Sequence, residues 1–198
     1  MDIPTLATDR LLLREWRDAD RTPFAELNAD PDVARFLNGP RDRAESDALV
    51  DRISAHWAEH GFGLWALERR EDERFIGFTG LYRPSFDAHF TPAVEVGWRL
   101  AREAWGHGYA TEAAARAAVA FGFETVGLDE ILSFTVPANV RSRAVMERLG
   151  MRRDAAGDFD HPRFEPGHHL RRHVLYRLRR EDWERAHAAD AATPREDR

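Results

Sequence analysis

Residues 93–114 read AVEVGWRLAREAWGHGYATEAA, which joins a strand pattern to a glycine-containing loop and the start of a helix. Side chains alternate between two faces along a strand, and here the apolar face carries Val94, Val96, Trp98 and Leu100. The other face carries Glu95 and Arg99, with Gly97 between them. A glycine in mid-strand indicates a bulge or a close approach of backbone.

Further elements follow this stretch in alternation. Residues 111–125 are rich in alanine, the best helix former, and residues 131–136 form a β-rich run that ends at Pro137. A second helix is predicted from Asn139, a good N-cap, to Gly150, which is placed to end it. The order strand, loop, helix, strand, helix predicts two neighbouring parallel strands in one sheet.

The N-terminal half predicts antiparallel strands and two helices. Strands are expected at residues 11–13, 62–68 and 74–81, the last two joined by a short turn, and a late strand at residues 174–178. A short helix should end near Asn28, and an amphipathic helix should span residues 45–60. The chain is thus expected to be mixed α/β around one central sheet. We expect one domain over residues 1–185 and a flexible tail over residues 186–198.

The composition excludes several classes of protein. The 198 residues carry a net charge of −6, without the basic face that nucleic-acid binding needs. The absence of cysteine excludes a disulfide framework, a thiolate zinc site and a cysteine nucleophile. No apolar run approaches the roughly 20 residues of a membrane span, and residues 1–4 lack the features of a signal peptide. We therefore expect a cytoplasmic protein with no nucleic-acid or membrane partner. The negative charge weakly favours a cationic ligand such as an amine.

The loop at residues 105–110 is suited to binding an anion. Gly106 and Gly108 let the backbone come close to a ligand, and the helix behind them presents unpaired N–H groups and a partial positive charge. Thr111 can add a hydroxyl donor. On this pattern alone, an ordinary strand-to-helix turn stays open. The loop lacks the Gly-Lys-Ser/Thr of a P-loop and the third glycine of a dinucleotide fingerprint, so ATP, GTP and NAD are poor candidates.

Three blocks of sequence occur in order along the chain. They are residues 8–14, then residues 94–98 with 105–113, and last residues 139–151, which contain an Asn-x-x-Ser motif. Together they resemble the GNAT superfamily of N-acetyltransferases, and within it the branch of ribosomal-protein N-terminal (alanine) acetyltransferases. Matches span about residues 8–178, nearly the whole chain.

This resemblance implies the GNAT fold, a mostly antiparallel central sheet with a splayed parallel strand pair and helices on both faces. It also implies acetyl-CoA as co-substrate, with no metal. The residues implied to bind the coenzyme are Val96, Gly97, Trp98, His107, Gly108, Tyr109, Ala110, Thr111, Asn139 and Ser142. The loop would hold the CoA pyrophosphate by backbone amides, and a backbone N–H on the strand would polarise the acetyl carbonyl.

Transfer to an amine is helped by a base, because an amine of pKa about 10.4 is mostly charged at pH 7. Glu95 is the leading candidate, and Asp160 and His161 are the alternatives. Ser142 is expected to protonate or orient the departing sulfur, because Met146 occupies the position of a tyrosine that many GNAT members use.

Each of these roles has a structural alternative. Glu95 could be a carboxylate paired with an arginine, Asn139 a plain N-cap and Ser142 a residue that stabilises the helix start. Glu112 is expected to complement the helix dipole and not to act in catalysis. Histidines and aspartates also gather in residues 158–173, but without a fixed short ligand spacing, so we expect a loop over the acceptor pocket and no metal site.

The sequence thus predicts an acyl-CoA-dependent N-acetyltransferase. The amine would attack directly in a ternary complex, because no cysteine or Ser-His pair offers a covalent route. The acceptor is expected to be a protein N-terminus or a small amine, and a homodimer stays open. A non-catalytic acyl-CoA-binding sensor is the alternative, favoured by Met146, and a metal-dependent hydrolase is the less favoured one.

Overall fold

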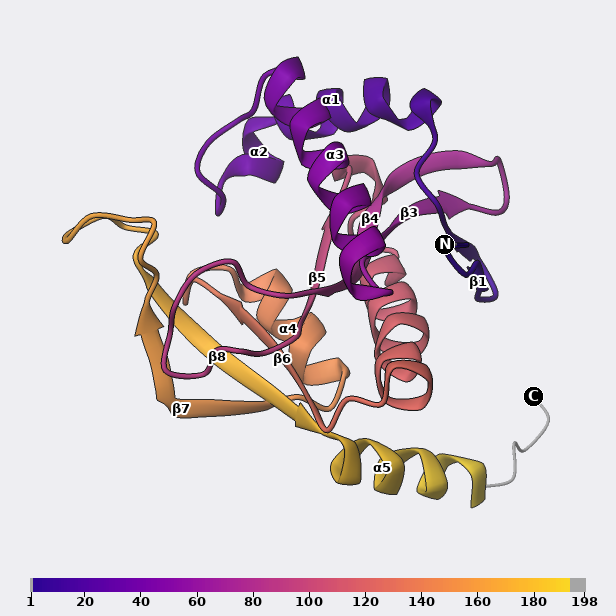
Figure 1. Cartoon of the computed structure of the whole chain (residues 1–198), viewed down its shortest axis with the longest axis vertical. Helices are drawn as coiled ribbons and strands as arrows, with labels where there is room; N and C mark the ends of the chain where they lie inside the picture. The colour runs from indigo at the N-terminus through magenta and orange to yellow at the C-terminus, as the bar shows by residue number, and fades with distance from the viewer. Residues whose placement is uncertain (1, 193–198) are drawn as a thin grey trace.

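The computed structural model describes residues 2–192, with the backbone alone at residues 114–116 and 189–192. Its centre is one eight-stranded sheet with the strand order β1-β2-β3-β4-β5-β6-β8-β7 (Figure 1). The strands are β1 (Leu6–Ala7), β2 (Leu11–Arg14), β3 (Leu64–Arg69), β4 (Arg74–Tyr82), β5 (Glu95–Leu100), β6 (Glu130–Thr135), β7 (Arg152–Asp160) and β8 (Arg172–Arg179). Neighbouring strands pair antiparallel except β5 and β6, which are parallel. The predicted mixed, mostly antiparallel sheet with one parallel pair is confirmed.

Helices cover both faces of the sheet. The first group comprises η1 (Asp18–Asp20), α1 (Arg21–Ala29), α2 (Pro31–Ala34) and α3 (Arg43–His60). After β5 and the short turn η2 (Arg102–Ala104), a helix over residues 109–126 is wound mostly as π-helix, at η3 (Thr111–Ala118) and η4 (Phe121–Val126), and α4 (Val140–Arg148) follows β6. Figure 1 shows α1–α3 gathered on one side and α5 (Arg180–Ala192) extending from the end of β8. No helix of the described chain has the length and apolar character needed to cross a membrane.

Aromatic contacts show which helices cover which face. The rings of Phe78 in β4 and Phe24 in α1 have centroids 5.9 Å apart. Thr79 follows Phe78 in β4, so its side chain points to the opposite face of the sheet. Trp65 of β3 pairs with Thr79 and therefore lies on that opposite face. Its ring centroid is 5.1 Å from that of Phe121 in η4. The α1 side and the side of the 109–126 helix are thus opposite faces of one sheet.

The register of β5 assigns its two sets of side chains to these faces. Arg99 pairs with Phe78, and Trp98 pairs with Thr79. Because cross-strand partners share a face, Arg99 lies on the α1 side together with Glu95 and Gly97. Trp98 lies on the side of the 109–126 helix. The alternation predicted for residues 93–100 is confirmed.

Two features of the C-terminal part were not expected. β7 is an edge strand beside β8, with an irregular register between Asp154 and Phe159. Its polar sequence has no alternation, and its charges are matched by the neighbouring strand, as where Arg177 donates to Asp154 at 2.7 Å. Helix α5 includes residues 186–192 of the expected flexible tail, and residues 193–198 lie outside the described residues.

A buried ion-pair network joins β2 to η1 and β3. Arg14 donates to Asp20 at 2.7 Å and to Glu68 at 2.6 Å. The three side chains are only 6%, 4% and 10% exposed. Burial alone would lower the pKa of Arg14, but the hydrogen bonds and charges of both carboxylates raise it above its usual value.

Replacing Arg14 with methionine is expected to lower the free energy of unfolding by about 3–5 kcal/mol, because two buried carboxylates lose their counter-charge. Arg17→Met is the matched control. Arg17 contacts the same Glu68 at 3.1 Å, but its side chain is 60% exposed, so we expect a loss below about 1 kcal/mol. Urea unfolding measures both variants, and equal losses would contradict the role assigned to Arg14.

Candidate active site

β5 and β6 pair at one point and then separate. Glu95 is in register with Leu132, whose N–H donates to the Val94 carbonyl at 2.9 Å. Both strands are fully described, and no later pair joins them. Successive residues of a strand turn their backbone polar groups to opposite edges. The N–H and C=O of Trp98, four residues after Val94, therefore face the gap between β5 and β6.

A buried serine bridges the two strands where they separate. Ser133 of β6 is 3% exposed, and its hydroxyl donates to the Val96 carbonyl at 3.0 Å. A side-chain hydrogen bond thus takes the place of a ladder bond at the last point of contact. Ser133 was not predicted as a site residue from the sequence, because it belongs to no motif. The available signal was a polar residue within an apolar strand, since buried polar groups need partners.

The glycine loop comes directly after β5 and η2. Gly106 (φ 83) and Gly108 (φ 79) are both left-handed, a conformation that glycine adopts without steric cost. The following helix starts at residue 109, and the Glu112 N–H donates to the Gly108 carbonyl at 3.0 Å. The N–H groups of residues 109–111 come before this bond and can receive an anion. The predicted loop and helix are confirmed, and a backbone cradle of this kind fits a pyrophosphate.

Residues from the start of the sheet hold this loop. The guanidinium of Arg10 donates to the His107 carbonyl at 3.0 Å and lies 4.7 Å from the ring centroid of Tyr109. Glu112 accepts from the Thr8 hydroxyl at 2.5 Å and from the Arg10 backbone at 2.9 Å. Burial would raise the pKa of Glu112, but these hydrogen bonds and the charge of Arg10 lower it below its usual value. Glu112 therefore anchors the helix start, which agrees with its expected structural role.

α4 packs against β6 and η3 and starts beside the same loop. The side-chain oxygen of Asn139 accepts from the Ser142 N–H at 3.3 Å, and its amide donates to the Thr135 hydroxyl at 3.0 Å. The guanidinium of Arg141 lies 4.7 Å from the ring centroid of Trp105. The glycine loop and the first turn of α4 are thus brought together. The N-cap role of Asn139 is confirmed, and the contacts of Asn139 and Ser142 with CoA stay predictions.

Glu95 is a half-buried acid with no hydrogen-bond or ion-pair partner among the described side chains. It lies opposite Tyr82 of β4. Burial raises the pKa of Glu95 to about 8, because desolvation disfavours the charged carboxylate. Its interpretation as a carboxylate paired with an arginine is therefore wrong. An unpartnered acid with a raised pKa beside an open strand edge fits proton transfer.

The two alternative bases have less suitable surroundings. Asp160 accepts from Arg171 at 3.0 Å, and this hydrogen bond lowers the pKa of Asp160. His161 is 8% exposed among aromatic rings, and burial lowers its pKa to about 4. Both groups are therefore weaker bases than an ionised Glu95, since base strength follows the pKa.

The histidines of residues 158–173 pack against aromatic rings. The aromatic cluster around His161 and His173 includes Phe86, Phe90, Phe134, Phe159 and Phe164. Next to it, Phe36, from the segment after α2, packs against Val136, Phe164 and Leu170. The loop between β7 and β8 therefore reaches the α1 side of the sheet. Among the side chains that the structure describes, no group of three or more His, Asp or Glu is arranged to hold a metal ion.

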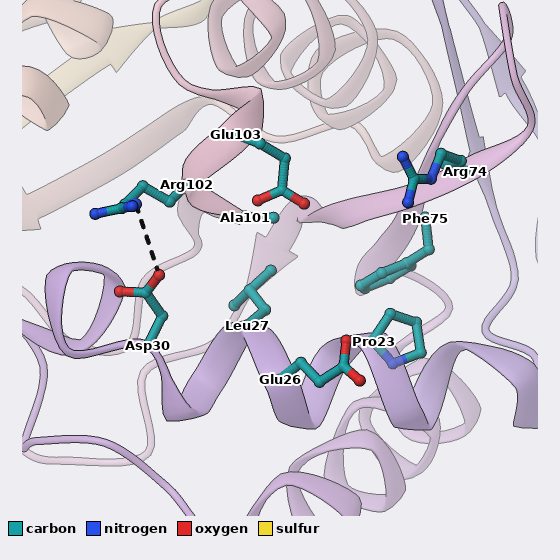
Figure 2. Close-up of a pocket in the computed structure, with 9 residues that line it drawn as sticks. All are labelled: Pro23, Glu26, Leu27, Asp30, Arg74, Phe75, Ala101, Arg102 and Glu103. Atoms are coloured by element: carbon teal, nitrogen blue, oxygen red, sulfur yellow. Dashed lines mark ion pairs between the residues drawn. The ribbon is translucent and has the colours of Figure 1, made fainter.

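A separate surface hollow of about 360 Å³ lies where α1 meets the ends of β4 and β5 (Figure 2). Its lining is formed by Pro23, Glu26, Leu27, Asp30, Arg74, Phe75, Ala101, Arg102 and Glu103. Figure 2 shows Arg102 turned toward Asp30, to which it is ion-paired at 3.9 Å. None of the predicted site residues lines this hollow, which is therefore distinct from the gap between β5 and β6.

Comparisons with known proteins agree with this geometry. A family model described as an acetyltransferase (GNAT) domain matches residues 10–152. The FsC-acetyl coenzyme A-N(2)-transacetylase of Aspergillus fumigatus is 31% identical over 191 residues, which cover 91% of this chain and 78% of that protein. An acetyltransferase crystal structure from Agrobacterium tumefaciens has 32% identity and a TM-score of 0.75, over 91% of this chain and 96% of that one. A ribosomal-protein-S5-alanine acetyltransferase from Vibrio fischeri, at 16% identity and a TM-score of 0.70 over 91% and 98%, shares the fold.

Glu112→Gln is expected to lower the free energy of unfolding at pH 7 by about 1–2 kcal/mol, because a neutral amide replaces a charged hydrogen-bond acceptor whose partner Arg10 is half exposed. The folded-state pKa of Glu112 is lowered, so its contribution is present above its usual pKa of 4.5 and is lost as the pH falls through the folded value.

Denaturant unfolding between pH 3 and pH 8 tests this expectation. The difference between the parent and the variant should shrink on acidification. Glu124→Gln, at an exposed position of the same helix, should change stability little at any pH. A difference that is independent of pH would show that the charge of Glu112 is not what anchors the loop.

Proposed function

The chain belongs to the GNAT acetyltransferase family, and we propose that it moves an acetyl group from acetyl-CoA to a primary amine by direct attack in a ternary complex. Acetyl-CoA is the acetyl donor of this family. The observation that carries the proposal is the separation of β5 from β6 after Glu95, with the glycine loop at the end of the same strand. The A. fumigatus relative, named for transfer at N(2), supports a nitrogen acceptor. Residues 1–185 would form the acyltransferase domain.

The proposed coenzyme site follows the gap. Backbone N–H groups between His107 and Thr111 would hold the pyrophosphate, with the partial charge of the helix start behind them. The pantetheine arm would lie along the open edge of β5, where Val96, Gly97 and Trp98 supply the floor. Since Ser133 already occupies the Val96 carbonyl, the backbone of Trp98 is the free pairing group. Asn139 and Ser142 would border the arm from the side of α4.

The Trp98 N–H is the proposed donor to the acetyl carbonyl oxygen. Negative charge develops on that oxygen as the amine attacks, and a fixed backbone donor stabilises it without reorganisation. The N–H points into the gap because the register at Val94 determines the direction of every second residue of β5. The sequence placed this donor within residues 96–98, and we favour Trp98 because Val96 lies where the two strands are still joined.

Glu95 is the proposed base, acting directly or through one water. It would take the proton that the amine loses as the nitrogen–carbon bond forms and the carbon–sulfur bond breaks. A carboxylate with a pKa near 8 is a stronger base than an ordinary one, which suits abstraction from an ammonium group. The sulfur leaves as a thiolate, whose conjugate acid has a pKa of about 8.5. Ser142, in the first turn of α4, would orient it.

A non-catalytic acyl-CoA sensor is the second candidate function. It is favoured by Met146, which stands where many family members have a tyrosine and which is 1% exposed in the core. An apolar side chain cannot donate a proton to the leaving sulfur. Both functions require binding of the coenzyme, but only the enzyme would transfer the acetyl group.

A thiol-release assay separates these two functions. The purified protein is expected to release CoA thiol from acetyl-CoA in proportion to an added amine, with α-amino acids, peptides and small amines as acceptors. Mass spectrometry should find a mass increase of one acetyl group on the acceptor. Tight CoA binding in calorimetry without thiol release from any acceptor would establish the sensor instead.

Glu95→Gln is expected to lower kcat/KM by roughly 100-fold or more, the usual effect of losing a general base. In the parent protein, kcat/KM should rise with pH through about 8, because the ionised form of Glu95 is the active one. The variant should lack this limb. The pH profile is measured with two acceptors whose amines differ in pKa. A rise in kcat/KM that is due to Glu95 stays near pH 8 with both acceptors, whereas a rise that is due to the amine shifts with the pKa of the amine.

Asp160→Asn is the control and should leave the rate nearly unchanged.

The stability of the folded protein adds an independent readout. The raised pKa of Glu95 means that its ionisation destabilises the folded state as the pH rises from 4.5 toward 8. Glu95→Gln should therefore be at least as stable as the parent at pH 8. Full activity of Glu95→Gln would rule out Glu95 as the base.

A further inference from the structure

The face of β5 that carries Glu95 has open space at Gly97. A Cβ placed on Gly97 would meet no atom within 4 Å. Glu95 and Arg99 follow on either side of Gly97 on this face, each about 7 Å away along the strand. The space therefore lies between a carboxylic acid and a guanidinium group. It adjoins the Trp98 edge, where the acetyl group is proposed to lie.

Arg99 is positioned by neutral partners. Its guanidinium donates to the side-chain oxygen of Asn28 in α1 at 2.5 Å, and the amide of Asn28 donates to Ser46 of α3 at 3.0 Å. Asn28 and Ser46 are 2% and 0% exposed, so this support is rigid. The guanidinium also lies 5.3 Å from the ring centroid of Phe78. Since an arginine has five N–H donors, most of those of Arg99 remain for a ligand.

A second arginine increases the positive charge at this place. The Arg41 N–H donates to the backbone carbonyl of Asn28 at 3.0 Å, the residue whose side chain holds Arg99. Burial, and then the charge of Arg41, lower the pKa of Arg99 to about 9. Burial and the charges of Arg52 and Arg163 lower the pKa of Arg41. Arg99 thus stays charged at pH 7.

No carboxylate of the described side chains forms an ion pair with Arg41 or Arg99. Glu45 acts on Arg41 only as a more distant charge. A charge that is taken out of water without a counter-ion is costly, and an anionic group on a ligand would remove this cost. This site is therefore positively charged, although the net charge of the whole chain is −6.

We propose that the acceptor amine carries a carboxylate close to its nitrogen, as a free amino acid does, and that Arg99 binds this carboxylate. The proposal rests on the proposed acetyl transfer and narrows its acceptor from any primary amine to an amino carboxylate. Arginine binds carboxylates through two parallel hydrogen bonds, which would turn the amine toward Glu95 and the thioester. A peptide N-terminus has an amide at that position and would be a poor acceptor.

The test compares acceptors that differ only in this group. Serine, methionine and phenylalanine are each assayed as the free acid, the amide and the decarboxylated amine. We expect the acid to exceed its amide at least tenfold in kcat/KM for the preferred side chain. The amide has the less basic amine and reacts more readily without enzyme, so a preference for the acid has to arise from binding. In Arg99→Gln the ratio of acid to amide should fall to one or below, mainly through a rise in KM for the acid. Arg99→Lys should retain part of the preference.

Arg102→Gln is the matched control. Arg102 lies just beyond the end of β5, 61% exposed and paired with Asp32, and its loss should leave the ratio unchanged. Equal rates for acid and amide in the parent, or an unchanged ratio in Arg99→Gln, would overturn the proposal.

Calorimetry with the same acids and amides keeps this inference separate from the proposed function. If no acceptor is acetylated, the proposed acetyl transfer fails. Acid binding that is tenfold tighter than amide binding, and that depends on Arg99, would still support the carboxylate site. Equal binding of acid and amide would refute it.

Discussion

The structure depends on the one register pair that joins β5 to β6, Glu95 with Leu132, where the Leu132 N–H donates to the Val94 carbonyl. Before this point the strands belong to one sheet, and beyond it they diverge. A parallel pair that continued would use every backbone group of both edges. Because it stops, the edge of β5 at Trp98 has no partner strand. Ser133 closes the last contact through its side chain and so limits the opening to the part beyond Val96.

Two glutamates, one on either side of the glycine loop, have different roles because their surroundings differ. Glu112 accepts hydrogen bonds from Thr8 and Arg10, and its pKa is lowered. Glu95, on the strand before the loop, has no described partner, and burial raises its pKa to about 8. A carboxylate that accepts hydrogen bonds stabilises the fold, whereas a buried carboxylate without a partner can bind and release a proton near neutral pH. The same residue type thus anchors the loop at one position and is suited to proton transfer at the other.

The α1 side of the sheet places a neutral carboxylic acid and a charged guanidinium on either side of Gly97. Glu95 is mainly protonated at pH 7, and Arg99 is charged and supported by Asn28. Such a surface carries positive charge although the chain as a whole is acidic. Net charge therefore says little about an acceptor site, because a few oriented groups at short range outweigh many distant, solvent-screened ones.

The sequence by itself determined the order of strands and helices from residue 93 to Gly150, the parallel pair, the glycine loop and the Asn139 cap. These features depend on side-chain periodicity and on signals within a few residues, which can be recognised without the fold. The tertiary structure alone decided that Glu95 lacks a partner, that Ser133 bridges to Val96 and that Arg99 meets Asn28. It also placed the polar strand β7 at the sheet edge. The contacts of Ser133 and Arg99 join residues 37 and 71 positions apart, and which distant groups meet is determined only when the chain packs.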